Sequence, residues 1–221
     1  MPDLDFTVLS VESAKHAAVP TLYFKLAIGQ RIQGGAGVAL IQNVALQCQF
    51  RIDCRRRLYA PEEKARLSEL FGAPDLWSRS LQSMLWTHTS LVVPAFGGDG
   101  IEVDLPVSCS FDFNLAATKY FDGLQHADIP LLLLFSGSIF YRSADGALEV
   151  APISWNTEIR YSLPLQVWRR MMDAFYPDCT WLSVSREVFD SLYEHKRRKH
   201  HTGFDETLSS LLPAVGKAAA S

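Results

Sequence analysis

The chain has 221 residues, of which 48% are hydrophobic and 20% are charged, and its formal net charge is −3. This composition excludes an intrinsically disordered chain, and the length allows one hydrophobic core or two small ones. The small net charge also excludes a general electrostatic attraction to nucleic acid or to an anionic membrane surface.

The first residues and the length of the apolar runs bear on where in the cell the protein is located. The first residues, MPDLDF, lack the basic and apolar regions of a secretory signal. The longest apolar run, residues 129–135, is far shorter than the roughly 20 residues that span a bilayer. We therefore expect a cytoplasmic protein.

The four cysteines are Cys48, Cys54, Cys109 and Cys179, and they show neither a CxxC pair nor the spacing of zinc ligands. Cys48 and Cys109 stand in phase with apolar neighbours, where a free thiol packs as a small hydrophobic group. Disulfides are rare in a reducing compartment. We therefore predict buried free thiols, and neither a bound metal nor a cofactor.

Alternating apolar side chains predict strands over most of the chain. In chain order, the clearest runs are residues 22–28, 44–52 and 101–115, in which every second side chain is apolar. Glycines at 34, 35 and 37 predict a flexible loop between the first two runs. Proline 61 and two glutamates then predict a helix over 61–72, and a second short helix is expected over 76–85.

The next strands are predicted between residues 86 and 161. A strand near 86–93 follows the helices, and the apolar run within 131–141 predicts a central strand covered on both faces. Asp145 and Gly146 predict a hairpin turn. In the returning strand, 148–161, the apolar phase changes near Pro152, which predicts a bulge or an edge position because proline has no N–H for the ladder.

The last part of the sequence predicts helices over 164–175, 186–200 and 204–212. In the second of these, Ser185 is a candidate N-cap and Gly203 a candidate stop. Four of its side chains are expected to form a buried stripe: Val188, Phe189, Leu192 and Tyr193.

Strands followed by helices indicate an α+β fold. We predict an antiparallel β-sheet with the C-terminal helices packed on it and a helical insertion at about 55–85. No composition shift divides the chain, so a single domain is expected over 1–221, with a flexible tail at 213–221.

The C-terminal block resembles the SecB family of export chaperones. The resemblance lies in SGSIF at 136–140, LP at 163–164, YP at 176–177, LSV at 182–184 and FDSLY at 189–193. It implies a SecB-like sheet, a homo-oligomer and a surface that binds other chains. Arg186 and Trp168 depart from that family's pattern, and the helical insertion has no counterpart there.

Nearly the whole chain is similar to a bacterial family called domain of unknown function 6084. The similar segments are LWTHTSLVVPAF at 85–96, FDFNLAATKYFDGL at 111–124, IPLLLLFSG at 129–137 and PLQVWRRMMDAFYP at 164–177. Members of that family tend to lie near hydrogenase genes. The resemblance therefore implies an accessory role toward a redox-enzyme subunit such as a hydrogenase subunit.

Large aromatic and thioether side chains of the last third are the candidate client-binding residues. If exposed, they would form an adaptable apolar groove for extended peptides, and if buried they would belong to the core. They are Trp155, Trp168, Met171, Met172, Phe175 and Trp181.

A basic run, Lys196, Arg197, Arg198 and Lys199, is a candidate surface for RNA, anionic lipid or an acidic partner. The alternative is a solvated helix end whose cations complement the helix dipole. His88 is the candidate base of an enzyme whose site is assembled from distant residues. Ser136-Gly137-Ser138 lacks the GxSxG pattern, so it predicts a kink in a strand.

We thus favour a non-enzymatic protein-binding or chaperone-like accessory factor whose partner is another protein chain. The alternatives are an enzyme whose site is assembled from distant residues and includes His88 or a cysteine, and a nucleic-acid or membrane-surface module that uses the basic run.

Overall fold

The computed structural model describes residues 2–31, 39–110, 115–143, 145–177, 179 and 182–212. Contacts group the chain into two compact units, Met1–Cys179 and Thr180–Ser221. The expectation of a single domain over 1–221 stays a prediction, because grouping by contacts does not establish whether either unit folds alone.

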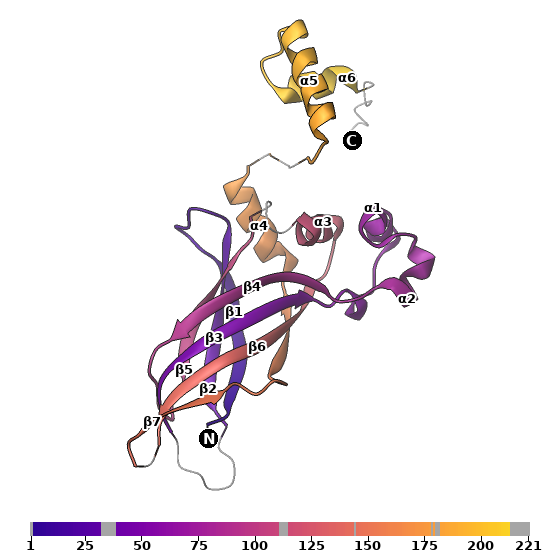
Figure 1. The fold of residues 1–221 in the computed structure, drawn as a ribbon. Helices are drawn as coiled ribbons and strands as arrows, with labels where there is room; N and C mark the ends of the chain where they lie inside the picture. The colour runs from indigo at the N-terminus through magenta and orange to yellow at the C-terminus, as the bar shows by residue number, and fades with distance from the viewer. Residues whose placement is uncertain are drawn as a thin grey trace. The chain divides into compact units, whose positions relative to one another are not determined.

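Two antiparallel sheets form most of the first unit (Figure 1). The smaller sheet has the order β1-β2-β5, and the larger has the order β4-β3-β6-β7, with β8 also paired to β6. The strands are β1 Leu4–Ser13, β2 Thr21–Gln30, β3 Leu40–Ile52, β4 Met84–Val93, β5 Ile101–Ser108, β6 Ile129–Arg142, β7 Leu148–Pro152 and β8 Glu158–Leu163.

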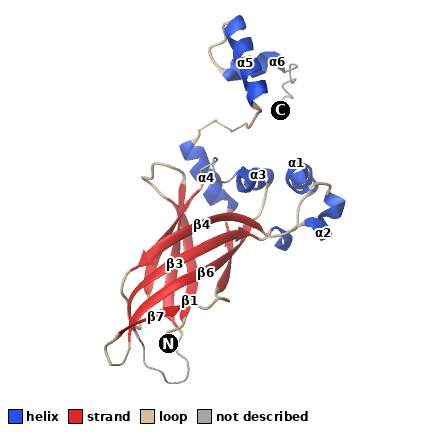
Figure 2. Cartoon of the chain, in the orientation of Figure 1, coloured by secondary structure: helices blue, strands red, loops and turns tan. Residues whose placement is uncertain are grey.

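Helices interrupt and follow these strands (Figure 2), which confirms the predicted α+β class. Figure 1 shows α3 and α4 at one end of the strands. The helical segments are η1 Cys54–Arg56, α1 Pro61–Phe71, η2 Pro74–Leu76, α2 Trp77–Ser80, α3 Leu115–Gly123 and α4 Leu165–Phe175 in the first unit, and α5 Arg186–Lys199 and α6 Phe204–Leu211 in the second.

Aromatic side chains join the two sheets face to face. Phe24 of β2 lies 4.8 Å from Phe50 of β3, measured between ring centroids. Phe6 of β1 stacks on Phe135 of β6 at 4.3 Å. All four rings are buried, because the two-residue period of each strand directs every second side chain to the space between the sheets.

The helices α3 and α4 extend this core beyond the sheets. Trp168 of α4 lies 5.1 Å from Phe121 of α3, and Phe121 lies 5.2 Å from Trp86 of β4. Residues of α4 also contact β1 and β2. The apolar stripe that predicts a helix over 164–175 is therefore the face by which α4 joins the core.

Several predicted boundaries are wrong. The predicted strand 101–115 ends at Ser108, residues 111–114 lie outside the described residues, and Leu115 begins α3. The predicted helix 76–85 is shorter, because α2 ends at Ser80 and β4 begins at Met84. The predicted strand 148–161 is two strands, β7 and β8, which both pair with β6.

Other predictions hold, some of them in part. The helical insertion predicted at about 55–85 lies between β3 and β4, with its helical segments within Cys54–Ser80. β7 lies at the end of its sheet's strand order, with Pro152 as its last residue. β6 is central, but only alternate residues in most of it are fully buried, so its cover is complete on one face alone. Within the described residues, no helix has the length and hydropathy needed to cross a membrane. The glycine loop at 34–37 lies outside them.

Gly137, at the position of the predicted kink, has a positive φ and a close neighbour on β3, and the pairing of β6 with β3 runs through it without a shift of register. Its φ is 138°, and a Cβ built there would lie 2.0 Å from the carbonyl oxygen of Ala45 on β3. Only glycine tolerates both conditions without a shift of the neighbouring strand.

We expect Gly137→Ala to lower the free energy of unfolding by about 2 kcal/mol or more, through backbone strain and displacement of β3. Urea unfolding of the full chain measures this change. Gly29→Ala in β2 is the matched control, because no atom lies within 4 Å of a Cβ at that position. An equal loss in both variants would contradict this explanation.

Candidate functional site

The six candidate client-binding residues do not form one surface. Trp168, Met171 and Met172 are buried in the core of the first unit, and Phe175 is half-buried against it. Trp155, in the turn between β7 and β8, is 93% exposed. Trp181 lies outside the described residues. The stripe on α4 therefore serves the core, and in this structure a client has no access to those three side chains.

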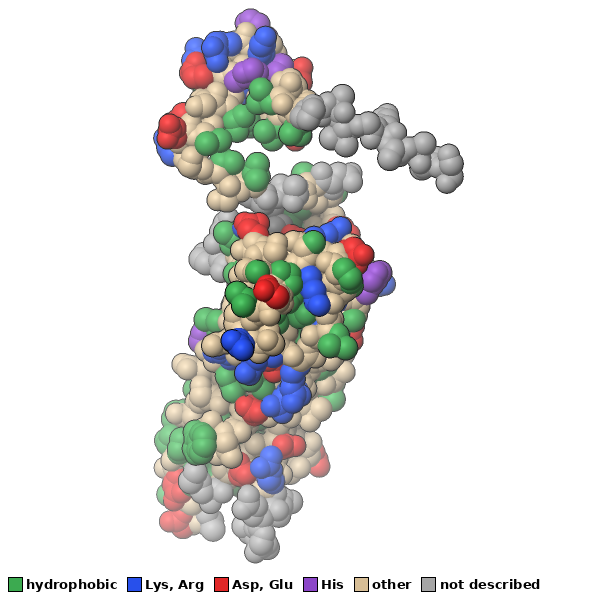
Figure 3. Space-filling model, turned by 90° about the vertical axis from the view of Figure 1, so that its right-hand side faces the viewer, with side chains coloured by type: hydrophobic (Ala, Val, Ile, Leu, Met, Phe, Trp, Pro, Cys, Tyr) green, Lys and Arg blue, Asp and Glu red, His purple; other side chains and the backbone are tan. Residues whose placement is uncertain are grey.

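The C-terminal unit, meaning residues 182–212, carries an exposed apolar surface instead. The predicted buried stripe on α5 is wrong, because α5 has no buried residue. In Figure 3 hydrophobic side chains gather on one side of this unit, and Lys, Arg and His side chains gather on another. The exposed large apolar side chains are Leu182, Val184, Val188, Phe189, Tyr193, Leu211 and Leu212.

The two helices of this unit nevertheless have a definite arrangement. Phe189 of α5 lies 5.6 Å from Phe204 of α6 and 6.4 Å from Tyr193, between ring centroids. Ser185 caps α5 as predicted, since its hydroxyl accepts the N–H of Val188 at 3.3 Å. The helix ends at His200, whose φ is 56°, and not at Gly203. The exposed rings are thus held in place by a helical hairpin.

The basic run occupies the last turn of α5, where its cations complement the helix dipole. Arg197 pairs with Glu194 at 2.9 Å, and Lys196 Nζ lies 6.0 Å from the centre of the Phe204 ring. These contacts favour the interpretation as a solvated helix end.

His88 has no catalytic neighbour among the described residues. It lies on β4, and its Nε2 is 3.4 Å from Nε2 of Gln49 on β3. No acid or thiol contacts its ring in the part of the chain that the structure describes, and those residues also hold no cluster of three metal-binding side chains.

The cysteines are free, and Cys48, Cys54 and Cys109 are buried as predicted, while Cys179 is exposed. Burial raises the pKa of Cys54 and of Cys109 to about 12, and it also raises the pKa of Cys48. These three thiols therefore stay protonated at neutral pH and are poor nucleophiles.

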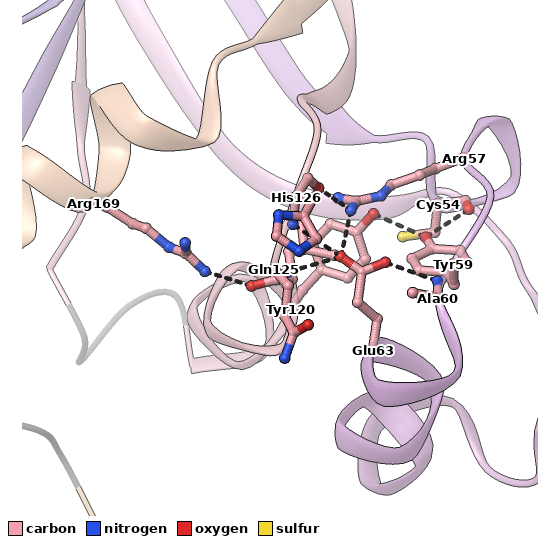
Figure 4. A network of polar contacts seen from close by, with 10 residues as sticks. Cys54, Arg57, Tyr59, Ala60, Glu63, Tyr120, Gln125, His126 and Arg169 are labelled. Carbon is pink, nitrogen blue, oxygen red and sulfur yellow. Dashed lines mark hydrogen bonds and ion pairs between the residues drawn. The ribbon is translucent and has the colours of Figure 1, made fainter. Parts of the chain in front are cut away.

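A buried ion pair joins η1 to α1, and the sequence did not reveal it (Figure 4). Nη2 of Arg57 lies 2.5 Å from Oε1 of Glu63, and the two side chains are 6% and 2% exposed. The same Nη2 also donates to the carbonyl oxygen of His126. The pair therefore ties the helical insertion to the segment that follows α3.

The Glu63 carboxylate is further held by backbone N–H groups. Its Oε1 accepts from Gln125 at 2.7 Å and from His126 at 3.4 Å, and its Oε2 accepts from Ala60 at 3.1 Å. Burial by itself raises the pKa of Glu63, but these N–H groups and the charge of Arg57 outweigh burial, so the pKa lies below its ordinary value.

Two tyrosines lie beside this pair. The hydroxyl of Tyr59 donates to the carbonyl oxygen of Cys54 at 2.7 Å and lies 2.8 Å from the hydroxyl of Tyr120. Burial raises the pKa of both tyrosines, so both stay neutral. The two hydroxyls are in direct contact and leave no space for a substrate between them. The neutral tyrosine pair therefore acts as a structural link between the insertion and α3.

Comparison with known proteins gives one result. A family model described as a family of unknown function (DUF6084) matches residues 1–220, which confirms the resemblance seen in the sequence. No curated protein and no solved structure matches the chain, so the resemblance to SecB is not confirmed.

We expect Glu63→Gln to lower the free energy of unfolding by about 3 kcal/mol at neutral pH, because it leaves the Arg57 charge buried without a counter-charge. Glu69→Gln is the matched control on the same helix. Its carboxylate is 75% exposed and pairs with Lys119, so a change within about 0.5 kcal/mol is expected. Urea unfolding measures both changes.

The pH dependence follows from the lowered pKa of Glu63. Its contribution is complete at neutral pH and is lost as the pH falls below 4.5, the ordinary value, through the lower pKa of the folded state. The stability of Glu63→Gln should therefore depend less on pH in that acidic range. The same acid dependence in both proteins would contradict this assignment.

Proposed function

We propose that this chain, which belongs to the DUF6084 family, is a non-enzymatic, chaperone-like accessory factor that binds another protein in the cytoplasm. One observation carries this proposal: the C-terminal unit keeps its large apolar side chains exposed. A group of large apolar side chains exposed on the surface of a folded protein often marks a site where another protein binds.

The packing of the C-terminal unit explains why a partner would bind there. Thr207 is its one buried residue among those described, so the unit has almost no core of its own. Helices of this length are marginal in water unless one face packs on something else. A partner that covers the apolar side chains gains roughly 25 cal/mol for each Å² removed from water.

The spacing of the apolar side chains on α5 indicates the mode by which the partner binds. Phe189 and Tyr193 are four residues apart, as are Val188 and Leu192, so these side chains lie along one face of the helix. An amphipathic helix of this kind binds in an apolar groove of its partner. The basic residues at the end of α5 would favour an acidic rim on that groove.

The partner we propose is a subunit of a redox enzyme such as a hydrogenase. The support is the tendency of family members to lie near hydrogenase genes. We also propose that the protein forms a homo-oligomer, which the resemblance to SecB implies and which sedimentation of the purified chain would test.

The test is binding of the full chain to the large subunit of a hydrogenase from the same organism, measured by biolayer interferometry. Leu182→Ser combined with Val188→Ser should weaken binding at least about tenfold, because both side chains are exposed and make the apolar surface. The double variant leaves Phe189 and Tyr193, and therefore the helical hairpin, intact.

The matched control replaces two equally apolar side chains on the edge strand β7. Leu148 and Val150 are 62% and 59% exposed, and Leu148→Ser with Val150→Ser should bind as tightly as the parent chain. No binding by the parent, or equal loss in both double variants, would overturn the proposal.

A further inference from the structure

The helical insertion carries a cavity that is open to solvent and whose charged lining is entirely basic. The cavity measures about 370 Å³ and lies between η1, α1 and α2. Arg55, Arg57 and Lys64 line it, and no acidic side chain does. Its volume lies near the lower end of the range found for small-molecule sites, roughly 300–1,000 Å³.

The three cations differ in how far they are already neutralised. Arg57 is paired with Glu63, but its Nε and Nη1 are buried and have no hydrogen-bond partner among the described residues. Nε of Arg55 lies 3.7 Å from Oδ1 of Asp53, which is too long for a hydrogen bond. Lys64 has no ion pair within the described part of the chain, so the cavity keeps an excess of positive charge.

Two aromatic side chains form the rigid wall of the cavity. Tyr59 and Trp77 both line it and meet edge to face, with ring centroids 5.3 Å apart. Trp77 is held by a hydrogen bond from its Nε1 to the carbonyl oxygen of Gly72 at 3.0 Å, and Tyr59 by its bond to the backbone of Cys54. A fixed aromatic corner of this kind favours a planar ring in the ligand.

We propose that this cavity is a binding site for a small organic anion that joins a negatively charged oxygen group to a planar ring. Arg55 and Lys64 pair with the negatively charged group of the ligand, and the rings of Tyr59 and Trp77 pack against its planar ring. All residues that line the cavity belong to the first unit. The anion site and the proposed protein-binding surface therefore share no residues, and each proposal can fail without the other.

The test is calorimetric titration of the full chain with phenyl phosphate, which has both the ring and the anionic group. Benzoate replaces the phosphate by a carboxylate, inorganic phosphate supplies the charge alone, and phenol supplies the ring alone. We expect saturable binding of phenyl phosphate or benzoate, and binding at least about tenfold weaker for phosphate and for phenol.

Two single variants on α1 locate the site. Lys64→Gln should weaken binding of the ring anion about fivefold or more, through loss of a charged contact. Arg66→Gln is the matched control, since it removes the same charge two residues away and outside the lining. Arg57 is left unchanged because it also pairs with Glu63.

No saturable binding of either ring anion up to about 10 mM would overturn the proposal, because the dissociation constant would then exceed that concentration. Equal affinity for phosphate and phenyl phosphate would overturn the role of the aromatic wall. Equal effects of Lys64→Gln and Arg66→Gln would overturn the location.

Discussion

Two short helices with one buried residue among those described cannot enclose their own apolar side chains, and in this respect the C-terminal unit differs from the first unit. In the first unit, two facing sheets bury aromatic rings between them, and α3 and α4 add Phe121 and Trp168 to the same core. In the C-terminal unit, the ring contacts of Phe189 and Tyr193 among the described residues are with each other and with Phe204, and both rings stay about half exposed. The first unit is thus stabilised by its interior, whereas the described residues of the second form almost no interior of their own.

The helical insertion is stabilised not only by apolar packing but also by a buried ion pair. The Arg57–Glu63 pair and three backbone N–H groups connect η1, α1 and the segment after α3. Burying such a pair is costly unless its hydrogen bonds are satisfied. Glu63 meets that condition, whereas Nε and Nη1 of Arg57 have no hydrogen-bond partner among the described residues. The excess positive charge of this region comes from Arg55, which has only a 3.7 Å contact with Asp53, and from Lys64, which has no ion pair among the described residues. That imbalance lies beside an aromatic wall, which is the physical basis for an anion site there.

The sequence predicted the strands well where one period was unambiguous. Cys48 and Phe50 alternate with polar residues, and both are buried in β3. Helix α3 was missed because the alternation of apolar residues that begins at Ile101 continues in the sequence to Leu115, while Ala117, Tyr120 and Phe121 follow the helical spacing. The choice between these periods depends on packing against α4 and β4, which no local pattern contains.

The candidate site could be predicted only in part, for a related reason. A helical stripe specifies that one face avoids water, but not which element covers that face. Trp168 on α4 and Phe189 on α5 therefore look alike in sequence, although the first is buried and the second exposed. The Arg57–Glu63 pair was equally hidden, because two of the three N–H groups that hold Glu63 come from residues more than 60 positions away.

Hydrogen–deuterium exchange of the full chain tests the central claim most directly. In the free protein, backbone N–H groups of α5 and α6 should exchange much faster than those of β3 and β6, because they lack a covering core. Addition of the proposed partner, a hydrogenase subunit, should slow exchange in α5 and α6 selectively. Slow exchange in both helices of the free, monomeric chain would show that their apolar surface is already covered, and it would contradict the claim.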